Sequence, residues 1–391
     1  MAKANKKKVL VLASTFPRWK NDTNPPFVYD LSQGLAKEMD ETVLAPHYPG
    51  AKDTETMGKL KVHRFHYFFE RFEKLAGNGG MLPTLKANKL YYLTVPFFML
   101  AEIIATIKLV REIKPDVIHA HWILPQGLAA YINKLINKTP YVVTSHGGDI
   151  FGLQNKFLIK LKKLVLDNAK SITVVSSAIK SEVLKINPIL ESKIEVVPMG
   201  VDTKLFNPNK YDEKLKKKYG ITGPFLLFVG RLVEKKGVKY LIGAMPAIIK
   251  KFPKTKLLIV GSGPLEAELK NHSEKLNLSK SIVFVGALEH KKLPKYFATA
   301  DIFISPSITG SDGDREGSPV SIMEGLSSGC KIITTIGDLE IIKPVKQKNV
   351  HNISSRVIKD ITSNSGNHST SHKDNFSWSR IFKSYVRIIN E

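Results

Sequence analysis

The chain contains almost no cysteine, since Cys330 is the only one among its 391 residues. A single thiol excludes an internal disulfide, and the chain therefore suits a reducing compartment or is indifferent to the redox state of its compartment. Cys330 lies in the apolar run CKIITT. That setting predicts a small buried core residue and not a reactive thiol.

Long uninterrupted apolar segments are also missing. The opening stretch MAKANKKKVLVLASTF places lysines before an apolar run, but the run is short, which favours a buried first strand over a signal peptide. Leu90–Val110 is apolar but contains Pro96 and Glu102. An amphipathic surface helix suits this segment better than a membrane span, and a helix packed on its own sheet is an equal alternative. We therefore expect no transmembrane helix and a cytoplasmic protein.

Acidic residues are too few to balance the basic ones, because 59 lysines and arginines oppose 35 aspartates and glutamates, for a net charge of +24. Such an excess suits nucleic acid, an anionic membrane or a phosphorylated substrate. The lysines are dispersed without a nucleic-acid motif, so we expect no specific nucleic-acid partner. Together with the apolar segment, the charge predicts peripheral contact with the inner face of an anionic membrane that carries a lipid-linked acceptor.

The residues that are present predict two α/β domains. Hydrophobic residues make up 43% of the chain, and 391 residues exceed one ordinary core. Short β-branched runs alternate with stretches of helical period, which is typical of doubly wound parallel sheets. The expected strands are KVLVLAS, TVLAP, KVHRFH, DVIHA, YVVTS, SITVVS and IEVVP in the first half and FLLFVG, KLLIVG, SIVFVG, DIFISP and KIITT in the second. Proline, glycine and lysine interrupt the pattern at 207–223, which we predict to link domains at 1–206 and 224–375.

Ligands of such sheets bind beyond the carboxyl ends of the strands, and the second half carries positive charge there. Gly230 ends a predicted strand, and Arg231 and Lys236 follow in a loop that opens a helix. Positive charge at this point can stabilise a diphosphate leaving group. A solvated basic turn is the alternative interpretation.

A second motif, DREGSPVSIMEG, follows the strand DIFISP. If Ser318 and Pro319 begin a helix, its exposed amides offer an anion site. Glu324, nearly two turns along that helix, can accept hydrogen bonds from a ribose diol. Glu316 precedes the helix and faces the sugar hydroxyls in this interpretation.

In the first half, YVVTSHGGDIFG places His146 just past a strand. A lone histidine is more often a structural hydrogen-bonding group than a functional one. Upstream, DVIHAHW carries His119 and His121, which we expect to point to opposite faces of their strand. With Asp149 these histidines could be imagined as a zinc site, but convergent ligands are not evident and we predict none.

Six motifs in a fixed order carry a family resemblance. They are HGGD, VVPMGVDTKLFNP, FVGRLVEKKGVKYLI, IVGSGPLEAELK, VGALEHKKLPKYFATADIFISPS and DREGSPVSIMEGLSSGCKIITT. The series resembles glycosyltransferase family 4, the retaining enzymes of the GT-B fold, most clearly over Ser145–Thr335. The resemblance implies two Rossmann-like doubly wound domains that face a central cleft, with the acceptor on the first and the donor on the second. It also implies a C-terminal helix at 376–391 that crosses back to the first domain.

The resemblance further implies a role for each matching residue. Arg231 and Lys236 match the family's diphosphate-binding pair. Glu316 and Glu324 match its paired glutamates, the first on the donor sugar and the second on the ribose. His146 matches a histidine near the donor sugar. The expected catalytic residues are thus His146, Arg231, Lys236 and Glu316, and the other donor-binding positions are Gly230, Gly261, Val285, Gly286, Leu288, Gly317, Ser318, Pro319, Val320, Ser321 and Glu324.

The reaction implied is transfer from a UDP- or GDP-linked sugar to a hydroxyl of a saccharide or lipid-linked acceptor, in polysaccharide or glycolipid biosynthesis. The resemblance favours same-face attack within an ion pair, with the leaving phosphate as base, over a covalent carboxylate intermediate. No cofactor is implied. Asp312 and Asp314 imitate the metal-binding aspartates of the other major glycosyltransferase fold, but they lie in a glycine-rich loop, and we predict no metal requirement.

The first loop of the chain departs from the family pattern. Pro25 and Pro26 stand in the region where members often carry a glycine pair. The acceptor side is therefore less defined than the donor side, with Phe16 and Asp149 as its candidates.

The segment after KIITT departs as well. Gly337 and Asp338 stand where a phosphate-contacting turn is expected, and the polar region 336–375 is shortened, which we expect to weaken donor binding or stability. This change favours one alternative, a nucleotide-sugar binding protein that has lost catalysis, although the intact cationic and histidine positions speak against it. An epimerase or phosphorylase on the same fold is a second alternative, for which neither the acid and base set nor a cofactor lysine is visible.

Overall fold

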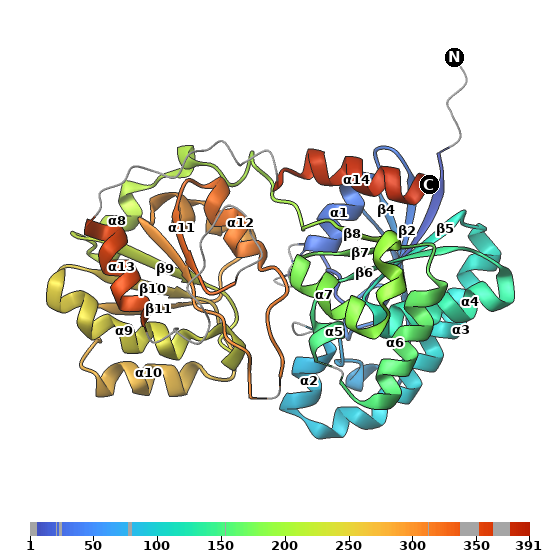
Figure 1. Ribbon diagram of the computed structural model, residues 1–391, viewed down its shortest axis with the longest axis horizontal. Coiled ribbons are helices and arrows are strands. Elements are labelled where there is room, and N and C mark those ends of the chain that lie inside the picture. The colour runs from blue at the N-terminus through green and yellow to red at the C-terminus, as the bar shows by residue number, and fades with distance from the viewer. Residues whose placement is uncertain are drawn as a thin grey trace, which may run out of the picture. The chain divides into compact units, whose positions relative to one another are not determined.

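The computed structural model describes residues 6–20, 22, 26–76, 80–152, 154–311, 313–336, 352–362 and 376–391 (Figure 1). The chain divides into two compact units. Unit 1 comprises Met1–Pro198 and Ser379–Glu391, and unit 2 comprises Met199–Trp378. Each unit is built on its own sheet of mainly parallel strands, which confirms the prediction of two doubly wound α/β halves.

Unit 1 holds an eight-stranded sheet in the order β3-β4-β2-β1-β5-β6-β7-β8. Its strands are β1 (Lys8–Leu12), β2 (Asp40–Pro46), β3 (Thr54–Met57), β4 (Leu60–Phe65), β5 (Val117–His121), β6 (Tyr141–Ser145), β7 (Ser171–Val174) and β8 (Ile194–Val196). Central strands such as β5 and β6 are buried along their whole length, as expected for parallel strands covered by helices. The strand β3 pairs antiparallel with β4 at the sheet edge. Its polar sequence TETM lacks the signals of a strand, so we did not predict it.

Helices connect and cover these strands. They are α1 (Phe27–Leu35), α2 (Met81–Ala87), α3 (Val95–Ile113), α4 (Leu128–Asn137), α5 (Gly148–Phe151), α6 (Lys156–Asn168), α7 (Ser177–Ile186) and α14 (Trp378–Asn390), with shorter turns η1 (Glu70–Phe72), η2 (Lys89–Thr94), η3 (Ile123–Gly127) and η4 (Pro188–Lys193).

The last helix, α14, packs in unit 1 although it follows all of unit 2 in the sequence. Tyr385 is fully buried there, and Lys7 Nζ donates a hydrogen bond to the carbonyl of Ile389 at 2.7 Å. The ring of Phe382 occupies the space where a Cβ at position 34 would lie, so Gly34 lets α14 approach α1 closely. This placement is the crossing back that the family resemblance implies.

Unit 2 holds a five-stranded parallel sheet in the order β11-β10-β9-β12-β13. Its strands are β9 (Phe225–Val229), β10 (Lys256–Val260), β11 (Ile282–Gly286), β12 (Ile302–Ser305) and β13 (Lys331–Thr334). Its helices are α8 (Glu213–Tyr219), α9 (Val238–Lys251), α10 (Glu266–Lys275), α11 (Leu293–Thr299), α12 (Val320–Ser327) and α13 (Ile353–Thr362), with turns η5 (Pro208–Lys210), η6 (Glu234–Lys236) and η7 (His290–Lys292). Leucine and isoleucine side chains of β9, β10 and α9 form its core. Cys330 is buried, as predicted.

Unit 1 ends at Pro198, ahead of the linker expected at 207–223. The segment between them already packs in unit 2. Val201 pairs with Ser377 in a parallel bridge, and the buried ring of Phe206 lies 5.9 Å from that of Phe297. The prolines and lysines at 207–223, which interrupt the alternation of strand and helix patterns, therefore belong to the surface of unit 2. They do not mark the point where the chain leaves unit 1.

The apolar segment expected to be an amphipathic helix is formed by η2 and α3. By length and composition Lys89–Ile113 could cross a membrane, which is weak evidence for a span. One face of α3 is packed in unit 1, where Phe98 and Leu109 are buried and Glu102 accepts a hydrogen bond from Gln126 at 2.9 Å. The opposite face exposes large apolar side chains.

Candidate functional site

The loops after β9, β10 and β11 meet at the carboxyl edge of the sheet of unit 2. The amide of Gly230 donates to the carbonyl of Val260 at 3.0 Å, and the amide of Gly261 donates to the carbonyl of Gly286 at 2.8 Å. Gly261 has a φ of +136°, and a Cβ on it would lie 1.9 Å from the carbonyl oxygen of Gly230. Glycine at position 261 is therefore required for these backbones to meet.

Arg231 follows Gly230 at this edge and carries a buried, unused donor. No described residue bonds its Nη1 atom, which is shielded from solvent. Burial lowers the pKa of the Arg231 guanidinium from its ordinary value. A buried N–H group without a partner is unfavourable, and an anion whose oxygen accepts a hydrogen bond from Nη1 would relieve this cost.

Lys236 ends η6 and forms an ion pair with Glu316, at 3.1 Å from Nζ to Oε2. Lys235 reaches the other oxygen of the same carboxylate at 3.4 Å and also pairs with Asp314 at 3.2 Å. Burial opposes the ionisation of Glu316, but the two ammonium groups outweigh it and hold the pKa of Glu316 below its ordinary value. The sequence interpretation placed Lys236 and Glu316 in one site and missed Lys235, although the doubled lysine was visible. Asp312 lies outside the described residues.

The helix α12 begins at Val320, slightly later than the expected start at Ser318 and Pro319. Pro319 is the N-cap residue and no side chain caps the helix, so its first amides are not used by a side chain. Glu324 is buried on α12 and accepts a hydrogen bond from His290 Nε2 at 2.6 Å. His290 follows the turn after β11, the turn expected to hold the base, and it was missed because an isolated histidine in EHKK carries no signal.

The remaining donor-side positions lie on the same loops. Gly317 is buried, whereas Ser318, Val320 and Ser321 are partly exposed at the start of α12. Val285 and Gly286 end β11 with Leu288 close behind, and all three are partly exposed. The structure thus brings the donor-side residues of unit 2 to one edge of one sheet, where ligands of such sheets bind.

Three histidines of unit 1 cluster at the ends of β5 and β6. His119 and His121 lie on the same face of β5, with ring centroids 4.2 Å apart, so the expectation that they point to opposite faces was wrong. Residues two apart in a strand share a face. His121 Nδ1 lies 2.9 Å from His146 Nε2, and His119 Nε2 lies 2.8 Å from Thr144 Oγ1.

Burial keeps these imidazoles neutral. It lowers the pKa of His119 to about 3, and burial with repulsion from His119 lowers that of His146 to about 3 as well. The ring of His146 lies against Trp122 and Phe27, with centroids 4.9 Å and 5.1 Å away. At physiological pH, His146 therefore offers a neutral donor and acceptor and no positive charge.

The acceptor candidates have different surroundings. Asp149 is buried, and its carboxylate accepts hydrogen bonds from the amide of Ile123 at 2.7 Å and from Ser145 Oγ at 2.9 Å. These bonds fix the loop that carries His146, and contact of Asp149 with an acceptor hydroxyl stays a prediction. Pro26 is the N-cap residue of α1, and Pro25 lies outside the described residues.

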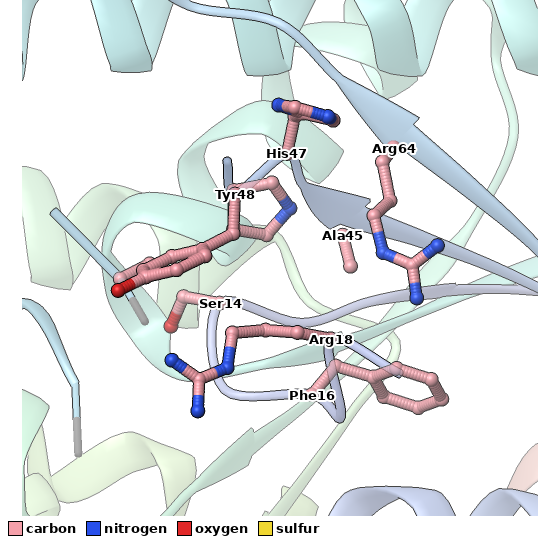
Figure 2. Close-up of a pocket in the computed structure, with 9 residues that line it drawn as sticks. Ser14, Phe16, Arg18, Ala45, His47, Tyr48 and Arg64 are labelled. Atoms are coloured by element: carbon pink, nitrogen blue, oxygen red, sulfur yellow. The ribbon is translucent and has the colours of Figure 1, made fainter. Parts of the chain in front are cut away.

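Phe16 lines a pocket of unit 1 (Figure 2). Other lining residues are Ser14, Arg18, His47, Tyr48 and Arg64. The guanidinium of Arg18 lies 4.6 Å from the ring centroids of both Trp19 and Tyr48. An ion pair of 2.6 Å to Asp22 holds it there. The pocket therefore combines aromatic faces with fixed cationic groups.

We expect the histidine cluster to make unit 1 sensitive to acid. His119 is neutral in the folded state down to about pH 3, whereas the unfolded chain takes up a proton below its ordinary pKa of about 6.5. The contribution of neutral His119 to the free energy of unfolding is therefore complete above pH 6.5 and is lost as the pH falls toward 3. His119→Gln cannot be protonated, so its unfolding free energy relative to the wild type should rise by roughly 2 kcal/mol between pH 7 and pH 5. Urea denaturation at both pH values measures this difference, and an unchanged difference contradicts the prediction.

Comparison with known proteins identifies the family of the chain. A family model described as "Glycosyl transferases group 1" matches residues 212–351, and one described as "Glycosyltransferase Family 4" matches residues 26–205. An uncharacterized glycosyltransferase from Methanocaldococcus jannaschii is 29% identical over 266 residues, which are 65% of this chain and 66% of that protein. A GDP-mannose-dependent monoacylated alpha-(1-6)-phosphatidylinositol monomannoside mannosyltransferase from Corynebacterium glutamicum is 37% identical over 157 residues, which are 38% of this chain and 41% of that protein. The chain thus matches two thirds or less of the length of these curated relatives.

Among solved structures, Anabaena Alr3699/HepE in complex with UDP and glucose has a TM-score of 0.72 and 15% identity, covering 98% of this chain and 99% of that one. A likeness at this identity shows the fold. The two family models show that the chain belongs to glycosyltransferase family 4, and the parallel sheets of both units with the match to this solved structure show that it has the GT-B fold.

Proposed function

We propose that this glycosyltransferase is a retaining enzyme that transfers a hexose from a nucleotide-diphosphate donor to a hydroxyl acceptor in polysaccharide or glycolipid biosynthesis. The observation that carries the proposal is the buried, unbonded Nη1 of Arg231, in the segment after β9 that also carries the Lys236 of the Lys236–Glu316 pair. Negative charge grows on the bridging oxygen as the sugar bond breaks, and fixed cations at that point favour the transition state. The named relative that depends on GDP-mannose and the structure holding UDP support a UDP- or GDP-linked donor.

Each group of unit 2 has a part in this reaction. The diphosphate of the nucleotide sugar accepts a hydrogen bond from Nη1 of Arg231. It also replaces Glu316 as the ion-pair partner of Lys236. Glu316, released from that ion pair but still near Lys235, accepts hydrogen bonds from the donor sugar. Glu324 accepts hydrogen bonds from the ribose hydroxyls, and the hydrogen bond from His290 fixes the position of its carboxylate. Amides at the start of α12 bind the phosphate oxygens.

We further propose that the acceptor attacks from the same face as the leaving group, within an ion pair. The leaving phosphate then removes the acceptor proton, and neutral His146 orients the donor sugar by hydrogen bonding. The alternative is a covalent glycosyl-enzyme. Mass spectrometry that trapped such an adduct on Glu316 or Asp149 would contradict same-face attack.

The acceptor side of the proposal rests on the pocket of Figure 2. Tyr48 offers a partly exposed aromatic face on which a sugar ring can stack, and the fixed guanidinium of Arg18 supplies positive charge that favours acidic groups. A saccharide, free or linked to a lipid, suits this chemistry.

A panel of nucleotide sugars tests the proposed function. Purified protein is heated with each donor in turn, and the matching donor at about 100 times its Kd should stabilise the fold by about 2.7 kcal/mol. The same samples are then assayed for slow donor hydrolysis. Stabilisation with hydrolysis supports the enzyme, stabilisation without it favours the binding protein that has lost catalysis, and no response to any UDP- or GDP-sugar contradicts the proposal.

We also propose that unit 1 contacts an anionic membrane through a surface on η1, η2 and α3. Exposed apolar side chains recur along the outer face of α3 at helical spacing, and exposed basic side chains occur in the same segments of the chain. The apolar set is Phe69, Leu90, Leu93, Phe97, Leu100 and Ile104, and the basic set is Arg71, Lys74, Lys86, Lys89 and Lys108. Apolar burial and attraction to anionic headgroups would act together at this surface.

The double variant Leu93→Asp/Leu100→Asp tests the membrane proposal. These side chains are 70% and 58% exposed, so aspartate leaves the fold intact and removes apolar area worth about 1.5–3 kcal/mol per residue. We expect co-flotation with phosphatidylserine vesicles to fall at least about tenfold. The matched control is Ile189→Asp on η4, where the side chain is 85% exposed outside this surface. Equal flotation of both variants contradicts the proposal.

A further inference from the structure

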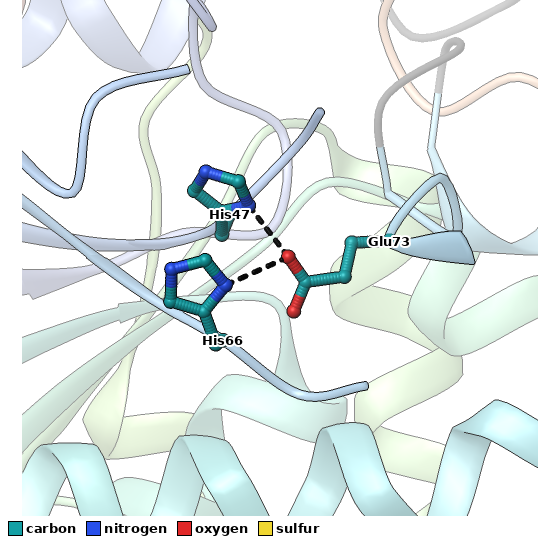
Figure 3. Close-up of side chains that lie close together, drawn as sticks. All are labelled: His47, His66 and Glu73. Carbon is teal, nitrogen blue, oxygen red and sulfur yellow. Dashed lines mark hydrogen bonds and ion pairs between the residues drawn. The ribbon is translucent and has the colours of Figure 1, made fainter. Parts of the chain in front are cut away.

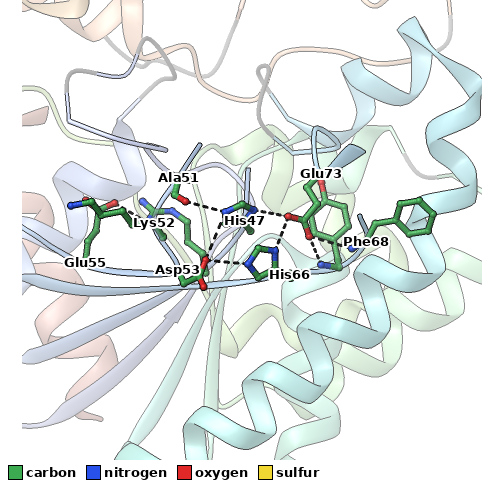
Figure 4. A network of polar contacts seen from close by, with 10 residues as sticks. His47, Ala51, Lys52, Asp53, Glu55, His66, Phe68 and Glu73 are labelled. Carbon is green, nitrogen blue, oxygen red and sulfur yellow. Dashed lines mark hydrogen bonds and ion pairs between the residues drawn. The ribbon is translucent and has the colours of Figure 1, made fainter. Parts of the chain in front are cut away.

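Four side chains of unit 1 form a closed ring of polar contacts away from the histidine cluster, and Figure 3 shows three of them, His47, His66 and Glu73. His47 follows β2, His66 follows β4, Asp53 precedes β3 and Glu73 follows η1. Glu73 Oε2 lies 2.5 Å from His47 Nδ1 and 2.9 Å from His66 Nδ1. On the other side of the two rings, Asp53 Oδ1 lies 3.1 Å from His66 Nε2 and 3.8 Å from His47 Nε2 (Figure 4).

This ring of contacts has too few donors. Among the described residues, the polar atoms beside the four ring nitrogens are all acceptors, because the carbonyl oxygen of Ala51 lies 3.0 Å from His47 Nε2 and the others are carboxylate oxygens. A neutral imidazole carries one N–H, so each ring would turn one bare nitrogen toward an oxygen. The other oxygen of Glu73 is already used by the amide of Tyr67 at 2.6 Å.

Positive charge is therefore needed inside the ring. Either each imidazole carries a proton on both of its nitrogens, or a metal cation replaces the protons on the nitrogens that face Glu73. Glu73 is 0% exposed and His47 is 2% exposed, so a carboxylate and an imidazole are both withdrawn from water. Burying such groups is costly unless their charges are balanced nearby.

The buried side has the geometry for a metal ion. His47, His66 and Glu73 each offer one ligand atom, and these atoms lie within 4.8 Å of one another. A tetrahedral zinc ion with bonds of about 2.0–2.1 Å separates its ligands by about 3.3 Å, so small side-chain rotations would admit it. Asp53 would then accept the Nε2–H of His66, as outer carboxylates do for metal-bound histidines, and the carbonyl oxygen of Ala51 would accept that of His47.

We propose that His47, His66 and Glu73 bind a divalent cation of the zinc class, with Asp53 as the outer carboxylate. Two imidazoles and a carboxylate without thiolates suit zinc and its transition-metal neighbours better than magnesium or calcium. The ion would tie the ends of β2 and β4 to the segment after η1. Because His47 also lines the pocket of Figure 2, it would fix one wall of that pocket. This role is structural and independent of the donor site.

Binding of zinc alone to the tag-free full chain tests this inference. After chelator treatment and dialysis, titration calorimetry at pH 7.5 should give one zinc per chain, and zinc should raise the melting temperature. The cobalt-loaded chain should show the visible absorption of tetrahedral cobalt. His66→Ala removes a ligand whose side chain is 47% exposed, and it should abolish all three signals. Asp53→Asn, at a side chain 71% exposed, should weaken zinc affinity by about 10–100-fold.

The matched control is His272→Ala on α10 of unit 2, which should bind zinc as the wild type does. Circular dichroism checks that each variant is folded. The inference is overturned if the wild type does not bind zinc, or if His66→Ala and Asp53→Asn bind it as tightly as the wild type. In either case the ring is satisfied by protons.

Discussion

Arg231→Ala should lower kcat with the matching donor by about 10²–10³-fold, the usual cost of removing one fixed donor from a site of developing negative charge. The guanidinium holds a buried Nη1 that no described residue uses, so little of the fold depends on it. The melting temperature without donor should therefore change little. Stopped assays of donor consumption, together with thermal melts, measure the two effects separately.

Two comparisons sharpen this prediction. Lys239→Ala removes a positive charge from the solvent-exposed face of α9, where the lysine pairs with Glu268, and it should leave kcat within about twofold. Arg231→Lys keeps the charge but loses the planar fork, so its activity should lie between alanine and wild type. If Arg231→Ala and Lys239→Ala have equal activity, the diphosphate does not bind at Arg231.

Gly261→Ala should destabilise unit 2 by roughly 3 kcal/mol or more, because it combines backbone strain with a collision. The φ of +136° is nearly restricted to glycine, and the added Cβ would lie 1.9 Å from the carbonyl oxygen of Gly230. To relieve this collision, the loops after β9 and β10 would have to move apart. Arg231 would move with them, so donor affinity should fall together with stability. Urea denaturation and donor-induced thermal shifts measure these effects.

The control for this variant is Gly243→Ala within α9. Nothing lies within 4 Å of a Cβ at that position, and alanine is the better helix former by up to about 1 kcal/mol. This variant should therefore be slightly more stable than the wild type. A Gly261→Ala protein as stable as Gly243→Ala would mean that the two loops do not meet as described.

The sheet strands were predictable because helix-covered parallel strands have continuous apolar sequences. KVLVL and FLLFV can be recognised on composition alone. The exposed edge strand TETM buries only Met57, so nothing in its composition separates it from a loop. The end of unit 1 was misplaced for a related reason. Phe206 joins unit 2 through long-range contacts, and local patterns do not report such contacts.

The sequence indicates that the candidate donor-binding residues share one edge of a sheet, but it does not indicate the contacts among them. Arg231, Lys236 and Glu316 stand in recognisable motifs, whereas the pairing of Lys235 with Glu316 and of His290 with Glu324 joins residues far apart in the sequence. The ring of His47, Asp53, His66 and Glu73 was invisible for the same reason. Its members follow or precede different elements. The order of β3, β4 and β2 in the sheet brings three of them together, and Glu73 comes from the end of η1.

The position of α14 has a consequence for how the protein is made. The ribosome synthesises the first 198 residues of unit 1, then all of unit 2, and only then residues 379–391. Until that last segment emerges, the apolar surface that covers Tyr385, Ile381 and Ile388 is bare. Unit 2 can complete its core during translation, whereas the surface of unit 1 that α14 covers stays exposed to solvent until the last residues are synthesised. A nascent chain stalled before α14 is therefore the form that most needs a chaperone.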